Sequence, residues 1–349
     1  MIAPKIEGRL YLFNLSLDKD NLVLRNNTIW AKLLSSYFTE TTVITTHKGK
    51  GTFSDFEYKV IELGGGTFVL RIRALLTLFL ILLNILFNKK RATVFYHMTT
   101  IPAAFVSPVL RLFKIKQGLW YSHQSATWML RISTKFVNVC FSPTENTFPL
   151  KTRKLIPVGH GIEPYKKTGE VDCANTTNSI AVVGRIARIK RIENLLHACS
   201  KVRKENVEIK LVGPLNDPEY LRELIVLAYK LEVNISYLGE LSFFDLLNSA
   251  EEYNMIFSGT VGSVDKAPLE FMSIGVPIVT SNRDLIGISG MSEFWHRNFS
   301  EELSEKSIEA QVNQLLSTSL TRSKRQELIE LVREKNNLDR LIQTIVKNL

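Results

Sequence analysis

The chain has 349 residues, of which 45% are hydrophobic and 22% are charged, and its formal net charge is +10. This length is too great for one average domain and suits two domains of about 150 residues each. The three cysteines are too few and too scattered for a disulfide framework or a zinc cluster, and the N-terminus lacks the layout of a secretory signal. We therefore expect a cytoplasmic protein.

Short runs of β-type residues alternate with helical stretches along the chain. Continuous apolar runs such as Ile180–Val183 suit strands buried on both faces of a parallel sheet, and helical spacing follows from Ile192 to Val202. This alternation predicts an α/β fold of two Rossmann-like, doubly wound parallel-sheet domains facing an interdomain cleft. The expected strands are Leu10–Asn14, Thr42–Thr45, Tyr58–Leu63, Thr93–His97, Gly118–Ser122, Val137–Ser142, Lys154–Val158, Ile180–Val183, Glu208–Val212, Ile235–Leu238, Met255–Phe257 and Ile278–Thr280.

Composition also predicts where the domains begin and end. A polar stretch around Glu163–Asn178, with Pro164 and Gly169, is the natural linker. We expect a first domain over residues 1–165, a linker over 166–178 and a second domain over 179–330. The helical tail over 331–349 is a candidate for crossing back to the first domain.

Positive charge is concentrated in the first domain. No Asp or Glu occurs between Leu63 and Thr144, whereas the same segment holds ten cationic residues. Such a surface favours an anionic partner, either nucleic acid or anionic lipid. No helix-turn-helix and no aromatic-rich basic strand appears, so we do not expect nucleic-acid binding.

The apolar segment Ala74–Phe87 favours lipid as that partner. Its fourteen residues are fewer than the roughly 20 that a spanning helix needs. Cations flank it on both sides, Arg71 and Arg73 before it and Lys89–Arg91 after it, as in helices that lie in the membrane interface. A buried core helix is the alternative for the apolar residues themselves. We expect a peripheral protein at the inner face of the cell membrane.

A group of basic residues follows the first strand of the second domain. Gly184 ends the apolar run Ile180–Val183, and Arg185 and Lys190 come before the next helix. Arginine binds phosphate oxygens in bidentate fashion, lysine adds a point charge, and a helix N-terminus favours anions. The sequence therefore predicts a diphosphate site here, with a solvated basic loop as the alternative.

A second constellation runs from Ser258 to Ser281 as strand, Gly-containing loop, short helix and strand. Pro268 suits a first helical turn and Gly275 suits a helix end. Glu270 is the one carboxylate of an otherwise apolar helix, which suggests an acceptor for a ribose or sugar hydroxyl. A salt bridge to Arg185 or Lys190 is the structural alternative.

These blocks resemble a known family. Val183–Arg185 with Lys190, then Lys210–Gly213, then Leu238–Glu240, then Pro268–Val279 are similar to the donor-binding domain of the retaining GT-B glycosyltransferase family 4, over about Ile180–Asn282. The resemblance implies retaining transfer from a nucleotide-diphosphate sugar, with no metal and no other cofactor. By position, Arg185 and Lys190 would hold the diphosphate and Glu270 the ribose. The further donor-binding residues would be Gly184, Gly213, Leu238, Gly262, Ser263, Asp265, Lys266 and Ala267.

One position departs from the family pattern. The family has two Glu residues separated by seven positions, and the first of them corresponds to Gly262. Asp265 lies close by, and a Gly-Ser-x-Asp-Lys-x-x-Leu-Glu form occurs in a bacterial polysaccharide-type subset of the family. Asp265 is therefore a candidate replacement for the absent carboxylate.

The first domain resembles the same subset more loosely. His97, His123 and His160 each follow an expected strand, and the resemblance places His123 near the sugar as a catalytic residue. A neutral imidazole there would accept from a sugar hydroxyl and stabilise positive character at the anomeric carbon. His97, Arg25 and Asn26 are candidates for acceptor binding. For a lone histidine, a structural role is the alternative.

The expected activity is therefore transfer of a sugar to a glycan or polyprenyl-linked saccharide in polysaccharide biosynthesis, such as that of lipopolysaccharide or capsule. A GT-B pseudoenzyme that docks on the membrane and supports another transferase is the alternative, favoured by the absent Glu at Gly262. A nucleotide-sugar epimerase is a third reading, which the membrane-seeking surface disfavours. The residues do not name the donor sugar, the base, the acceptor or the linkage.

Overall fold

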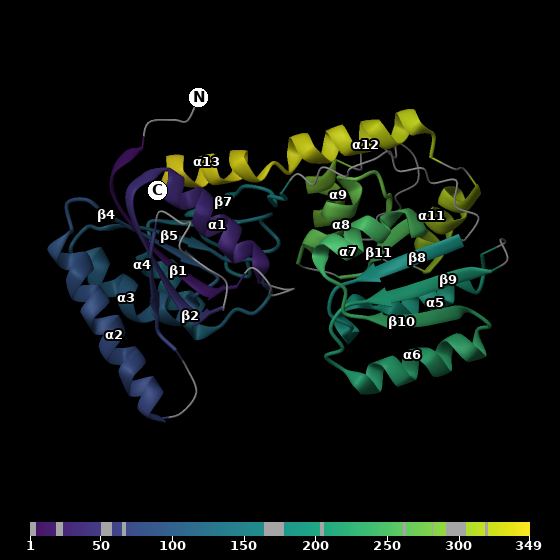
Figure 1. The fold of residues 1–349 in the computed structure, drawn as a ribbon, viewed down its shortest axis with the longest axis horizontal. Helices are drawn as coiled ribbons and strands as arrows, with labels where there is room; N and C mark the ends of the chain where they lie inside the picture. Colours follow the sequence, from purple (N-terminus) through teal and green to yellow (C-terminus); the bar gives the residue numbers. More distant parts are fainter. Residues whose placement is uncertain are drawn as a thin grey trace. The chain divides into compact units, whose positions relative to one another are not determined.

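The computed structural model describes residues 5–18, 24–49, 58–64, 68–163, 178–202, 206–260, 263–280, 282–290, 305–317 and 320–349. The chain forms two compact units, Met1–Val158 with Asp339–Leu349 (unit 1) and Gly159–Leu338 (unit 2). The expected linker, apart from Asn178, lies outside the described residues, and the domain boundaries drawn from the sequence stay predictions. Figure 1 shows the elements of both units.

Unit 1 is a seven-stranded parallel sheet in the order β3-β2-β1-β4-β5-β6-β7. Alternate residues of each strand point to opposite faces, so each face is covered by its own helices. On one face Phe13 and Tyr96 pack with α2, α3 and α4 in one apolar cluster. On the other face Trp30 of α1 stacks on Phe95. The strands are β1 (Ile6–Leu17), β2 (Phe38–Lys48), β3 (Lys59–Glu62), β4 (Ala92–His97), β5 (Lys116–Trp120), β6 (Val139–Ser142) and β7 (Leu155–Pro157).

The helices of unit 1 come from both ends of the chain. They are α1 (Arg25–Ser36), α2 (Phe68–Phe87), α3 (Thr100–Leu112), α4 (Trp128–Phe136) and α13 (Leu338–Asn348). All but the first residue of α13 belong to unit 1. At the end of the chain the Leu349 side chain lies against Gly118 of β5, where a Cβ atom would come within 2.4 Å of it.

Unit 2 is a five-stranded parallel sheet in the order β10-β9-β8-β11-β12. Its central strand alternates between two cores, because Ile180 and Val182 pack with α5, α6 and α11 whereas Ala181 and Val183 pack with α7, α8, α9 and α12. The strands are β8 (Asn178–Val183), β9 (Val207–Val212), β10 (Asn234–Gly239), β11 (Met255–Ser258) and β12 (Ile278–Thr280). The predicted architecture of two parallel sheets flanked by helices is confirmed.

The helices of unit 2 connect these strands and end the unit. They are η1 (Arg188–Lys190), α5 (Ile192–Cys199), α6 (Pro218–Lys230), α7 (Phe243–Asn248), η2 (Ser249–Glu252), α8 (Lys266–Met272), α9 (Arg283–Ser289), α11 (Glu305–Ser317) and α12 (Arg322–Lys335). Pro218 lies in the first turn of α6, and Asp217 caps that helix by accepting from the Tyr220 amide.

One expectation about local structure is wrong. The sequence placed Arg71 and Arg73 before a fourteen-residue helix, but α2 begins at Phe68 and has 20 residues, so both arginines lie inside it. Residues 70–87 are long and apolar enough to cross a membrane, and 11% of them are buried. The argument from length against a spanning helix therefore fails. Helical backbone continues through the arginines because they are good helix formers.

Candidate active site

The strand order of unit 2 reverses between β8 and β11. From β8 the chain adds β9 and β10 on one side, and then returns to add β11 and β12 on the other. Open parallel sheets bind ligands outside the carboxyl ends of the strands at such a switch point. The loops that follow β8 and β11 are therefore where a site is expected.

Lys190 and Asp265 join these two loops. Lys190 Nζ lies 2.7 Å from Asp265 Oδ2 and donates to the Val183 carbonyl at 3.2 Å. The Thr260 hydroxyl donates to the same carboxylate oxygen at 2.7 Å. The lysine side chain is 10% exposed and the aspartate 24% exposed. One cation and one anion, both partly dehydrated, thus sit at the switch point.

The Asp265 carboxylate is held in its ionised form. Burial by itself would raise the pKa of Asp265. The charge and hydrogen bond of Lys190, the Thr260 hydroxyl and the charge of His160 outweigh it, so the pKa lies below its ordinary value of 3.8. Asp265 therefore accepts hydrogen bonds at neutral pH and does not serve there as a proton donor.

Two glycines allow close approach at these strand ends, Gly184 to Lys190 and Gly213 to Gly184. Gly184 has φ +106°, and a Cβ atom there would lie 3.2 Å from Lys190 Nζ. Gly213, after β9, has φ +136°, and a Cβ atom there would lie 2.4 Å from the Gly184 carbonyl oxygen. Such backbone suits glycine because L side chains rarely adopt these angles. The backbone at the carboxyl ends of β8 and β9 thus permits close approach at Gly184 and Gly213, two positions predicted to bind the nucleotide-sugar donor.

Asn282 holds the loop that carries Asp265, and the sequence did not single it out. Its Nδ2 donates to the carbonyls of Thr260 and Ser263, at 2.7 Å each. Its Oδ1 caps α9 by accepting from the amides of Asp284 and Leu285. The side chain is buried. The cap was readable from an Asn directly before a helix, but the bonds to the loop depend on tertiary packing.

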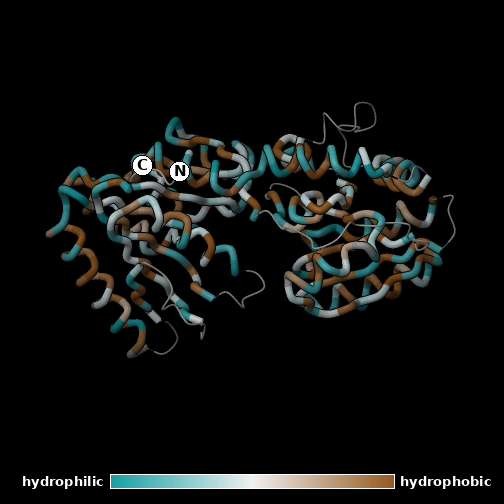
Figure 2. Tube along the Cα trace, turned by 45° about the horizontal axis from the view of Figure 1, so that its top comes forward, coloured by the Kyte–Doolittle hydropathy of each residue, from teal (hydrophilic) through white to brown (hydrophobic). Residues whose placement is uncertain are grey.

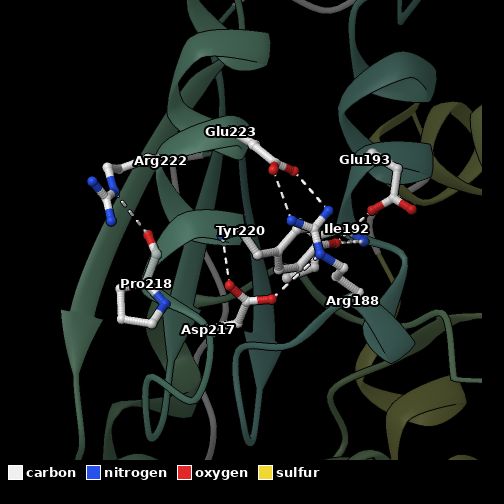
Figure 3. Close-up of polar contacts among 8 residues, drawn as sticks. All are labelled: Arg188, Ile192, Glu193, Asp217, Pro218, Tyr220, Arg222 and Glu223. Atoms are coloured by element: carbon white, nitrogen blue, oxygen red, sulfur yellow. Dashed lines mark hydrogen bonds and ion pairs between the residues drawn. The ribbon is translucent and has the colours of Figure 1, made fainter.

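Arg188 belongs to a different network from Lys190. Its guanidinium donates to both carboxylate oxygens of Glu223 at 2.7 Å and lies 3.3 Å from Asp217 (Figure 3). It also lies 5.1 Å from the centroid of the Tyr220 ring. The Tyr220 hydroxyl donates to Glu193 and accepts from the Ile192 amide. This network fastens the loop after β8 to α6, so Arg188 positions that loop while Lys190 pairs with Asp265.

The other residues predicted to bind the donor lie on the same strand ends or on α8. The Arg185 side chain is exposed and makes no hydrogen bond or ion pair among the residues that the structure describes. Glu270 is buried in α8, and Leu238 is 43% exposed near the end of β10. Ser263, Lys266 and Ala267 are half-buried, and Gly262 lies outside the described residues.

In unit 1 the predicted histidines differ in exposure. His123 is exposed in the loop after β5, and its Nδ1 accepts from the Ser125 amide at 3.0 Å. His97, at the end of β4, is buried, and its ring stacks on Trp30 at 4.4 Å between centroids. Arg25 and Asn26 form the first turn of α1 and are half-buried.

A known protein family matches most of unit 2. Residues 177–317 match the family described as glycosyl transferases group 1. This match covers the β8 to α11 part of unit 2, which contains the Lys190–Asp265 pair. None of the curated proteins matches the chain in sequence.

Solved structures match over the whole length. HepE from Anabaena, in complex with UDP-glucose, superimposes with a TM-score of 0.72 at 11% identity, over 97% of this chain and 98% of that one. A glycosyltransferase from Rickettsia africae has a TM-score of 0.69 at 14% identity, over 97% of each chain. The lipopolysaccharide outer core galactosyltransferase WaaB has a TM-score of 0.70 at 10% identity, over 97% and 98%. The fold is GT-B. Together with the match to glycosyl transferases group 1, this fold supports the interpretation of the chain as a GT-B glycosyltransferase.

Proposed function

We propose that this protein is a retaining glycosyltransferase. It takes a sugar from a nucleotide diphosphate and transfers it to a glycan or polyprenyl-linked saccharide at the cytoplasmic face of the membrane. The observation that carries the proposal is the Lys190–Asp265 pair at the switch point of unit 2, inside the segment that matches glycosyl transferases group 1.

The donor diphosphate is the ligand that this chemistry fits best. Lys190 brings a largely buried cation to the strand ends, and the exposed Arg185, which directly follows Gly184, can add a bidentate donor. Negative charge grows on the diphosphate as the glycosidic bond breaks, so these cations stabilise the transition state more than the ground state. Transfer without a metal ion is part of the proposal, since the two cations offset the charge of the leaving group. Glu270 is proposed to accept from the ribose.

Asp265 has two roles in this proposal. It holds Lys190 in place through the 2.7 Å contact, and it offers its second oxygen to a hydroxyl of the donor sugar. It would thereby replace the carboxylate that the family pattern has at Gly262. HepE and other similar structures hold UDP or UDP-glucose, so uridine nucleotides are the first donors to test.

The acceptor is proposed to bind to unit 1, close to His123. His123 Nδ1 already accepts from the Ser125 amide, so the neutral imidazole carries its proton on Nε2 and can donate to a sugar oxygen. His97, Arg25 and Asn26 are proposed as acceptor-side residues, with the buried His97 acting by holding Trp30 in place. Retention follows if the acceptor hydroxyl attacks the face from which the diphosphate leaves, with a phosphate oxygen as base.

Calorimetric titration with UDP, followed by hydrolysis assays over a panel of UDP-sugars, tests the proposal. Arg185→Ala and Lys190→Ala each remove a charge-assisted hydrogen bond of about 1.5–3 kcal/mol, so donor affinity and hydrolysis should fall roughly 10- to 100-fold. Lys230→Ala, which removes an exposed cation at the end of α6, is the matched control. UDP binding without turnover of any sugar would favour the pseudoenzyme alternative. Wild-type rates in both variants would refute the assigned site.

A further inference from the structure

Unit 1 exposes apolar side chains along α2. The helix is 20 residues long, and residues 70–87 have a mean hydropathy of 2.1. Figure 2 shows the hydrophobic colour running along this helix. Its exposed large apolar residues are Leu70, Ile72, Leu75, Leu76, Phe79, Leu80 and Phe87. An apolar surface of this kind on a soluble domain marks a contact with a membrane or another molecule.

The opposite face of the same helix belongs to the core of unit 1. Ile81 and Ile85 are buried, and Leu78, Leu82 and Leu86 pack against the same cluster. A helix that crosses a bilayer alone is surrounded by lipid, whereas α2 has its own domain along one face. The exposed face can therefore contact lipid only if the helix lies along the surface of the bilayer.

A second helix extends this surface. α3 packs into the same core cluster through Val106 and Leu110, in the same helical layer as α2. Its outward face carries Ile101, Phe105 and Leu112, the last of them 81% exposed. Helices in one layer on one face of a sheet turn their outward sides the same way. The two apolar faces thus form one surface, of which the sequence indicated only the α2 part.

Cations border this surface, and the chain between Leu63 and Thr144, which includes both helices, has no Asp or Glu. Lys89, after α2, lies with its Nζ 5.8 Å from the centroid of the Phe113 ring, after α3. This contact joins the basic end of one helix to the aromatic end of the other. Arg91 pairs with Glu7 at 3.1 Å. The other exposed cations on α2, on α3 or in the turns that follow them make no ion pair within the described part of the chain, and they are Arg71, Arg73, Lys89, Lys90, Arg111 and Lys114.

We propose that the outward faces of α2 and α3 form one docking surface that lies in the plane of an anionic lipid leaflet. The apolar side chains enter the boundary between headgroups and acyl chains, and the bordering cations contact lipid phosphates. This inference rests on the proposed function, which places the protein at a membrane, and it specifies the surface that would contact the lipid. Lipid is favoured over nucleic acid because exposed Leu and Phe side chains gain nothing from a phosphate backbone.

Flotation of the purified full chain with vesicles tests the surface. The protein should float with vesicles of phosphatidylcholine and phosphatidylglycerol. Its binding should weaken as the salt concentration rises, and its binding to vesicles of phosphatidylcholine alone should be at least about tenfold weaker. Each basic residue near an anionic leaflet contributes about fivefold, so Lys89→Ala with Lys90→Ala should weaken binding more than tenfold. Equal binding to both kinds of vesicle, or no binding to either, would overturn the proposal.

Two double variants test which surface binds. Leu76→Glu with Phe105→Glu places an acid on each helix at sites that are 61% and 58% exposed, so the fold should survive and vesicle binding should be lost. Ile225→Glu with Tyr229→Glu, on α6 of unit 2, makes the same change at exposed apolar sites elsewhere and should bind like wild type. Wild-type binding by the first variant would refute the α2–α3 surface. Bound protein should be released by alkaline carbonate, and retention would indicate a spanning helix.

Hydrolysis of UDP-sugars in vesicle-free buffer separates this inference from the proposed activity. A protein that hydrolyses donor but does not float with anionic vesicles contradicts only the docking surface. A protein that floats but neither binds nor hydrolyses donor contradicts only the transferase assignment.

Discussion

Replacing Asn282 by Ala tests whether the loop that carries Asp265 is held by a single buried side chain. The substitution removes two hydrogen bonds to the carbonyls of Thr260 and Ser263 and the cap of α9. Each bond contributes about 1 kcal/mol, and the cap contributes about another 1 kcal/mol. Because the Thr260 carbonyl is left buried without this donor, we expect a loss of roughly 3–4 kcal/mol of local stability.

Two variants separate the loop bonds from the cap. Asn282→Asp keeps an oxygen to cap α9 but cannot donate to the two carbonyls, so the loop should still loosen. Thr321→Ala, in contrast, removes only a side-chain cap, that of α12, and should cost about 1 kcal/mol. The structure thus supplies one variant that keeps the cap and one that loses only a cap.

Amide hydrogen exchange is the appropriate assay, because a chain with two compact units need not unfold in one step. Exchange at residues 263–265 should speed up about 100-fold in Asn282→Ala and Asn282→Asp and stay unchanged in Thr321→Ala. UDP affinity should fall in the same two variants, since Asp265 would no longer hold Lys190. Unchanged exchange in Asn282→Asp would refute the role assigned to the two carbonyl bonds.

The remaining predictions concern the same strand ends and the buried thiols. Because the pKa of Asp265 lies below 3.8, its ionised form stabilises the fold above about pH 4, and this stabilisation is lost as the pH falls through the lower native pKa. Urea unfolding should therefore show Asp265→Asn less stable than wild type at neutral pH, with the difference vanishing in acid; a constant difference would contradict the pairing with Lys190. Gly213→Ala places a Cβ atom 2.4 Å from a backbone oxygen at φ +136°, so we expect a loss of about 2 kcal/mol or more and a visibly lower melting temperature of unit 2. Burial raises the pKa of Cys140 and Cys199 to about 12, so iodoacetamide at pH 8 should label neither in the folded protein and both after denaturation, as peptide mass spectrometry would report.

Much of the fold was readable from the order of residues. Each strand expected from the apolar runs overlaps an observed strand, and Ile278–Thr280 agrees in both bounds. Strands of parallel sheets are buried on both faces, so they leave continuous apolar runs that need no knowledge of their neighbours. The helix from Ile192 to Cys199 was likewise evident from its spacing.

The limits of local pattern are clearest at α2. The basic residues before Ala74 were expected to precede the first turn of the helix, yet Arg71 and Arg73 lie inside α2, which begins at Phe68. Hydropathy cannot separate a face packed on the core from a face in solvent when both are apolar. Only the packing of Ile81 and Ile85 against the sheet distinguishes them.

The candidate site shows the same division. The order of residues along the chain shows that Gly184 and Lys190 follow a strand, and the resemblance to glycosyltransferase family 4 added Gly213 and Asp265 as candidates. Tertiary structure alone decided that Lys190 pairs with Asp265, that Arg188 turns instead to Glu223, and that Asn282 ties the loop. The physical reason is that a strand's own residues fix where it ends, whereas a contact between two loops depends on which strands become neighbours in the sheet.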